Sequence, residues 1–120
     1  MKNQTIYHYT MGLPKGFDSN VGTVPLRYTR HAVDASQNDK YGPIKLPACL
    51  DTAAALCIEV YLQDGAVSKL VYRVTQSGPT DLVFVVVPDG RAFKVLTVWK
   101  NLKSDRHETL KSWKYARPAA

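Results

Sequence analysis

The sequence predicts an α+β fold: a four-stranded antiparallel meander (about 56–100) with one N-terminal helix (about 29–40) packed on it, plus a short N-terminal strand or hairpin. Three observations lead to this prediction. Four strand-like runs are separated by short turn clusters, one segment before them has helix start and stop signals, and the 120-residue length is that of a single domain, 1–120.

The meander rests on four runs that are rich in β-branched and aromatic residues. Asp64-Gly65 separates the first two runs, and Asp-Gly is the strongest short-range signal for a hairpin. A second Asp-Gly turn, Asp89-Gly90, separates the last two. Because the connections are short, neighbouring strands should be antiparallel. The runs span 56–62, 66–75, 82–87 and 92–99.

The helix is predicted between two boundary signals. Thr29 can cap its N-terminus, and Gly42-Pro43 is a typical stop. Between them Ala32, Val33 and Ala35 form a narrow apolar stripe. We expect this stripe to pack on the sheet.

The two ends of the chain are less regular. Residues 6–10 read as a strand, and 24–28 as a second strand that Pro25 should confine to an edge. Residues 101–120 form a basic C-terminal segment with few apolar anchors, and its end is expected to fray.

Composition argues against a membrane or metal-dependent role. The longest apolar run, 82–87, has six residues, too few to span a bilayer, and nothing resembles a signal peptide. Cys49 and Cys57 are not at a metal-ligand spacing, so we expect no metal site and no cofactor. We expect a cytoplasmic protein with no membrane partner.

All of the net charge lies in the last thirty residues. Residues 1–90 carry eight basic and eight acidic side chains, whereas 91–120 carry eight basic and two acidic ones, which leaves +6. Both tryptophans lie in the same stretch. A neutral body with a basic, aromatic end favours a polyanionic partner, most often nucleic acid.

The order of elements resembles that of the RelE-like and colicin-like small ribonucleases, with the style of a small bacteriophage accessory protein. The resemblance covers roughly 28–115 by topology, with short motifs: Tyr28-Thr29-Arg30-His31-Ala32 on the helix, Arg73 on the second meander strand, and Val98-Trp99-Lys100-Asn101 leading to Asp105-Arg106-His107-Glu108-Thr109-Leu110. It implies metal-free cleavage of RNA by a cyclising mechanism.

This chemistry needs an acid, a base and cations that stabilise phosphate charge. The resemblance assigns His107 as acid or base, His31 as its partner, and Arg73 and Arg106 as phosphate stabilisers. Three of these four residues have an ordinary alternative. His31 could hydrogen-bond to the sheet, His107 could be solvated, and Arg73 could be buried and paired, for example with Glu59.

Further residues are candidates for nucleic-acid binding. The cations would hold the backbone, and the two aromatics would either stack on bases or dock the tail on the sheet. They are Arg30, Lys100, Lys103, Lys111, Trp113, Lys114 and Tyr115.

Three functions follow as hypotheses. The first is an RNA-acting protein, in its sharpest form a metal-free endoribonuclease of phage or toxin type. The second is a non-catalytic phage-type inhibitor that binds an acidic surface of a host protein. The third is a plain nucleic-acid-binding module.

Overall fold

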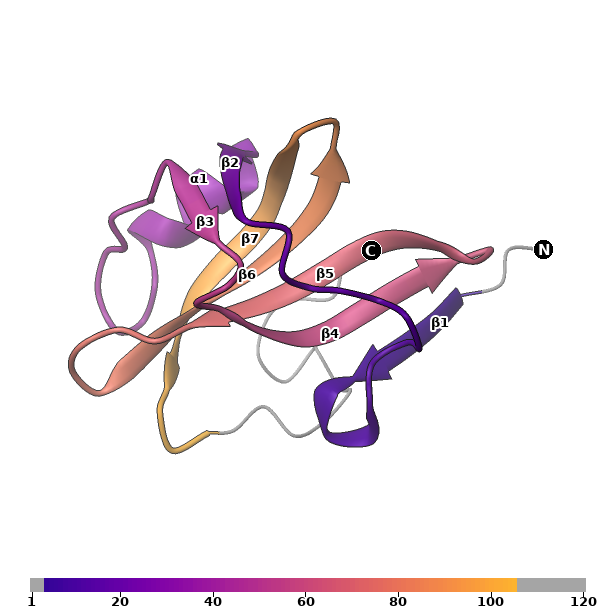
Figure 1. Ribbon diagram of the computed structural model, residues 1–120. Coiled ribbons are helices and arrows are strands. Elements are labelled where there is room, and N and C mark those ends of the chain that lie inside the picture. Colours follow the sequence, from indigo (N-terminus) through magenta and orange to yellow (C-terminus); the bar gives the residue numbers. More distant parts are fainter. Residues whose placement is uncertain (1–3, 106–120) are drawn as a thin grey trace.

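The computed structural model describes residues 4–105, and these form a strongly curved, seven-stranded sheet with one α-helix (Figure 1). The strand order is β1-β4-β5-β6-β7-β2-β3. Along the chain the elements are β1 (Gln4–His8), the 3-10 helix η1 (Tyr9–Met11), β2 (Thr23–Tyr28), α1 (Arg30–Gln37), β3 (Cys49–Asp51), β4 (Leu56–Gln63), β5 (Ala66–Val74), β6 (Thr80–Asp89) and β7 (Ala92–Leu102).

The predicted α+β fold, a four-stranded meander (about 56–100) with an N-terminal helix (about 29–40) on it, is wrong. The described chain is mostly β, with a mixed sheet of seven strands and one helix of eight residues. The four predicted runs lie within β4 to β7 except for Thr75, which follows the end of β5, and β1, β2 and β3 extend the sheet at both ends. These three strands pair with distant parts of the sequence, which no local pattern encodes.

Local turn chemistry explains the hairpin between β4 and β5. Asp64 and Gly65 both have positive φ, 52° and 84°. This conformation matches the twist of antiparallel strands, and Asp and Gly tolerate it better than most residues. A two-residue connection therefore joins the two strands directly.

The parallel pairing of β2 with β7 turns the sheet into a mixed one. Leu26 lies opposite Phe93, and Tyr28 lies opposite Val95. The parallel register begins at Leu26, so Pro25, which has no N–H, precedes it. β2 was expected at an edge, but the three-residue strand β3 pairs with it on its other side.

α1 follows β2 directly. The Thr29 hydroxyl accepts a hydrogen bond from the Ala32 N–H at 3.1 Å, as an N-cap does, while the Thr29 N–H donates to the Val95 carbonyl. The second of these bonds attaches the start of the helix to β7. The buried residues of the helix are Ala32 and Ser36. The helix packs on β7 and β2, so it covers only that end of the sheet.

The two faces of the sheet bury different clusters. The main core contains Tyr72, Phe84 and Val95 with their neighbours, and α1 and the loops pack against it. A second cluster, on the opposite face, is built on Ile58, Tyr61, Val71 and Val83. Alternation along β5 separates the two, because Tyr72 points to the main core and Val71 to the second cluster.

β7 continues to Leu102, so the first two residues of the predicted basic C-terminal segment (101–120) belong to the sheet. Within the described part of the chain, no helix is long and apolar enough to cross a membrane.

Candidate functional site

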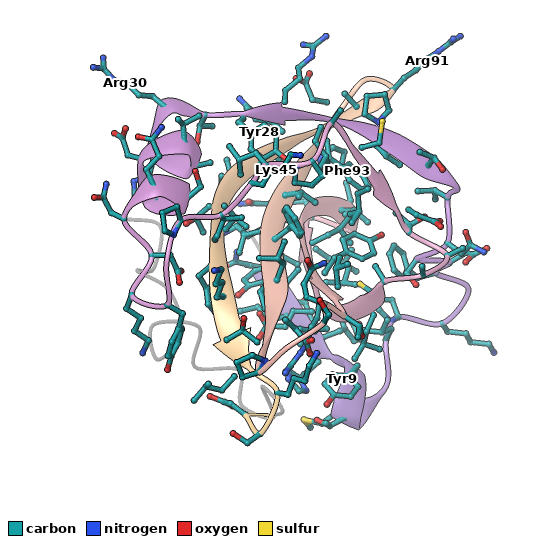
Figure 2. The ribbon with its side chains drawn as sticks, turned by 90° about the vertical axis from the view of Figure 1, so that its left-hand side faces the viewer. Tyr9, Tyr28, Arg30, Lys45, Arg91 and Phe93 are labelled. Carbon is teal, nitrogen blue, oxygen red and sulfur yellow. The ribbon has the colours of Figure 1, made fainter. Side chains whose placement is uncertain are left out.

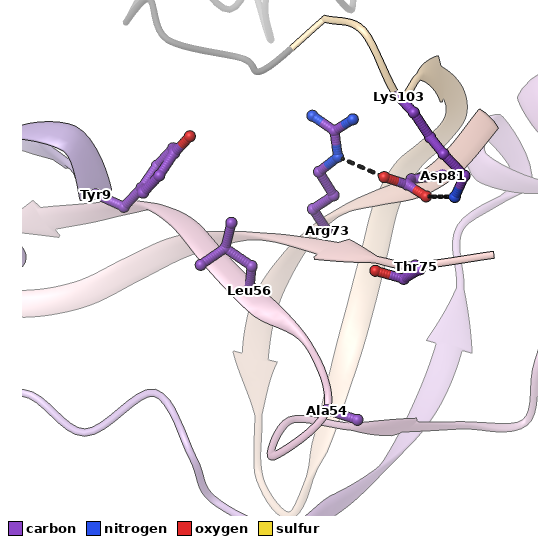
Figure 3. Close-up of a pocket in the computed structure, with 7 residues that line it drawn as sticks. All are labelled: Tyr9, Ala54, Leu56, Arg73, Thr75, Asp81 and Lys103. Carbon is purple, nitrogen blue, oxygen red and sulfur yellow. Dashed lines mark hydrogen bonds and ion pairs between the residues drawn. The ribbon is translucent and has the colours of Figure 1, made fainter. Parts of the chain in front are cut away.

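Three charged side chains meet where β5, β6 and the end of β7 lie side by side (Figure 3). The Arg73 Nε donates to Oδ2 of Asp81 at 3.0 Å, and the Lys103 Nζ donates to the other carboxylate oxygen. The side chains of Arg73 and Asp81 are each only 10% exposed. We call these three residues the Asp81 cluster.

Arg73 also fastens the chain after β7. Its Nη2 donates to the Leu102 carbonyl at 3.1 Å, and its Nη1 donates to the Asp105 carbonyl at 2.6 Å. The Asn101 side-chain amide donates to the same Asp105 carbonyl. Arg73 therefore links β5 to the segment that leaves the sheet.

Asp81 is held in its charged form. Burial raises its pKa, but hydrogen bonds from Lys103, the Gln76 N–H and Arg73 outweigh burial and lower the net pKa below its ordinary value. The carboxylate is therefore ionised at neutral pH, and two cations neutralise it. The cluster as a whole carries one net positive charge.

A pocket of about 320 Å³ opens beside this cluster. In Figure 3 the Tyr9 ring and the Leu56 side chain lie on one side of the Arg73 guanidinium, and Asp81 with Lys103 lies on the other. The lining residues are Tyr9, Ala54, Leu56, Arg73, Thr75, Asp81 and Lys103.

A second group of cations lies on a different part of the sheet. Arg27 on β2 and Lys94 on β7 are direct partners in the parallel pairing. Their neighbours along each strand pack into the main core, so both side chains point to the opposite face, and both are exposed. We call them the Arg27–Lys94 pair. Asp89 contacts Arg27 at 3.4 Å across an exposed ion pair.

Two further cations extend from the rim of the molecule that holds β2. Figure 2 shows Arg30 on α1 and Arg91 on the β6–β7 turn, both pointing outward, with Tyr9 at the opposite end of the molecule. Both arginines are exposed.

The structure brings together two of the predicted site residues, Arg73 and Lys103, in the Asp81 cluster. The Arg73 side chain is largely buried and is paired, as in the alternative in which it lies on a covered face, but its partner is Asp81 rather than Glu59. Three of its N–H groups donate within the chain.

The structure does not bring His31 to this cluster. Arg30 and His31 lie in the first turn of α1, both are exposed, and α1 packs on β7 and β2. Arg73 lies on β5, which β6 separates from β7 in the strand order.

Lys100 has an internal contact. Its Nζ donates to the Tyr41 carbonyl at 3.2 Å, and its backbone N–H donates to the Asp39 carboxylate. It therefore ties the loop after α1 to β7.

The remaining predicted residues lie outside the described part of the chain. They are the catalytic candidates Arg106 and His107 and the binding candidates Lys111, Trp113, Lys114 and Tyr115. Their assigned roles stay predictions, as does any meeting of His31 with His107.

The two cysteines differ in environment. Burial, together with the nearby Glu59, raises the pKa of Cys57 to about 12, whereas Cys49 is exposed. Cys57 is therefore a neutral thiol at physiological pH. Among residues 4–105, no group of three His, Cys, Asp or Glu side chains is placed to hold a metal ion.

Sequence reasoning missed several residues of these sites. Asp81 had a usable signal, because a carboxylate at the start of a buried strand needs a cationic partner. Tyr9 and Leu56 had none, since they meet Arg73 only through the packing of η1, β4 and β5. The Arg27–Lys94 pair depends on a parallel pairing between distant segments.

No protein-family model, curated protein or solved structure matches this chain. The resemblance to the RelE-like group therefore stays a prediction.

Proposed function

We propose that this chain is a cytosolic nucleic-acid-binding protein, with RNA as its preferred polymer, and that it contacts the phosphate backbone with its exposed cations. The observation that carries the proposal is the Arg27–Lys94 pair: two like charges directly opposite one another on adjacent strands. Such a pair costs stability, and an anionic partner removes that cost.

The surroundings of this pair support the proposal. The Arg27 side chain is 72% exposed and its ion pair with Asp89 is long and exposed, so a phosphate can compete for the guanidinium. Arg30 and Arg91 are exposed on the rim that holds β2 (Figure 2). The +6 net charge of the whole chain adds a general attraction for polyanions.

The test is fluorescence anisotropy with a labelled RNA oligonucleotide and a DNA of the same sequence, across a salt series. We expect tighter binding of RNA, and binding that weakens as salt rises. The double variant Arg27→Ala/Lys94→Ala should reduce the salt slope by about one for each cation removed. Lys15→Ala, at an exposed position in the loop after η1, is the matched control and should bind as wild type.

Absence of salt-dependent binding to either polymer would contradict the proposal. So would a double variant that binds as well as wild type. In that case capture of an acidic protein is the next hypothesis to examine. The same mixtures, incubated in EDTA and run on a denaturing gel, test the ribonuclease hypothesis through the appearance of shortened RNA.

A further inference from the structure

The pocket beside the Asp81 cluster has two unlike walls. Tyr9 contributes an aromatic ring from η1, and Leu56 contributes an apolar side chain that is 47% exposed at the start of β4. The Arg73 guanidinium faces them from β5 (Figure 3). A space bounded by an aromatic ring, an aliphatic side chain and a guanidinium suits a flat, partly apolar group with polar edges.

The cationic wall retains capacity for hydrogen bonding. A guanidinium has five N–H groups, and three of those on Arg73 donate to Asp81, Leu102 and Asp105. Counted over residues 4–105, two N–H groups of Arg73 are therefore left for a ligand. The exposed Thr75 hydroxyl adds a donor and an acceptor at the rim.

The position of the guanidinium is fixed before any ligand arrives. Its bonds to the Asp81 carboxylate and to two backbone carbonyls hold it in one orientation. A pre-organised group loses little conformational freedom on binding. The net positive charge of the Asp81 cluster also favours a ligand that carries a phosphate.

We infer that this pocket holds an unpaired nucleobase, so that the nucleic acid bound by this protein is single-stranded; the inference rests on the proposed function. Aromatic rings and guanidinium planes are the surfaces on which proteins stack single-stranded bases. A base within a duplex is already paired and stacked, so it must first be unpaired and flipped out of the helix before it can enter such a pocket, which disfavours duplex binding. The volume of about 320 Å³ is at the lower end of the range for small-molecule sites, as a single base requires.

The experiment compares a labelled single-stranded RNA with a duplex of the same sequence, by anisotropy at one salt concentration. We expect wild type to prefer the single strand. Tyr9→Ala should weaken single-strand binding about tenfold and leave duplex binding unchanged, because one stacked base is lost. Tyr9→Phe keeps the ring and should bind as wild type.

Tyr9 also packs against the second cluster, so a second variant guards against an effect on folding. Leu56→Glu places a carboxylate at an exposed position in the pocket wall and should weaken single-strand binding selectively. Val21→Glu is the matched control, because Val21 is 57% exposed and lies outside the pocket. Circular dichroism should show the same fold for all four variants.

The possible results separate the two proposals. Equal binding of single strand and duplex, or full single-strand binding by both Tyr9→Ala and Leu56→Glu, overturns the pocket assignment and leaves the proposed function standing. Failure of wild type to bind either nucleic acid overturns the proposed function and the pocket assignment together.

Discussion

Two groups of cations in this protein have the same kinds of side chain and opposite surroundings. Arg73 and Lys103 converge on the buried carboxylate of Asp81. Arg27 and Lys94 lie side by side on the sheet surface, with the exposed Asp89 as the partner of Arg27. In the first group one buried carboxylate pairs with both cations, whereas both cations of the second group are exposed to the solvent.

The difference shows that the role of a cation depends on its neighbours and not on residue type. Arg73 was a catalytic candidate, yet three of its N–H groups fasten the fold. Arg27 had no assigned role, yet its guanidinium is the more accessible of the two. The hydrogen-bond partners of each cation therefore show how much of its donor capacity is used within the fold and how much is left for a ligand.

The largest effect should come from removing the buried carboxylate. Asp81→Ala removes the carboxylate that pairs with Arg73 and Lys103, and we expect a loss of about 3 kcal/mol in the free energy of unfolding. The matched control is Asp89→Ala, which breaks an exposed ion pair and should cost less than about 0.5 kcal/mol. Urea unfolding of both variants measures the contrast, and equal losses would remove the distinction between the two groups.

A pH titration sharpens the same comparison. The pKa of Asp81 is lower in the folded chain than its ordinary value of 3.8, because hydrogen bonds to its charged form outweigh burial. A lowered folded-state pKa gives stability that is present above the unfolded value and is lost as pH falls through the folded one. We therefore expect the free energy of unfolding of wild type to decrease as the pH is lowered below about 4.

The control for this titration is Asp81→Asn, which has no carboxylate to protonate at this position. Its stability should depend less steeply on pH in the acid range, while Asp89→Asn should follow wild type. Identical acid profiles for wild type and Asp81→Asn would show that this carboxylate does not govern acid stability.

The smallest effect on stability concerns the exposed group. Lys94→Glu replaces a like-charged cross-strand pair by an opposite-charged one, and should stabilise the fold by roughly 0.2–1 kcal/mol. The same change should weaken RNA binding, because it reverses a charge on the proposed contact surface. Thermal unfolding and anisotropy measure the two effects, with Lys15→Glu as the control of equal charge change.

The opposite signs make this variant informative. If Lys94 did not contact RNA, replacing it by a stabilising residue would leave the affinity of the protein for RNA unchanged. Weaker binding by a more stable protein therefore cannot arise from partial unfolding. Unchanged binding would place the contact surface elsewhere.

Part of the fold can be predicted from the sequence because it depends on the chemistry of adjacent residues. The Asp64-Gly65 hairpin and the Thr29 cap are properties of a few adjacent residues, and both are present in the structure. Much less of the candidate site can be predicted from the sequence. Arg73 and Lys103 were identifiable as cations, but their convergence on Asp81 depends on strand register and on the path of the chain after β7.

Residue types and their order are enough to specify the turns, the strand-forming runs and the concentration of positive charge toward the C-terminal end. The seven-stranded sheet, the parallel pairing of β2 with β7 and the convergence of Arg73 and Lys103 on Asp81 depend on the folded chain as a whole. The physical reason is range. Turn and strand preferences act between neighbouring residues, whereas pairing between distant segments is chosen by the packing of the whole core.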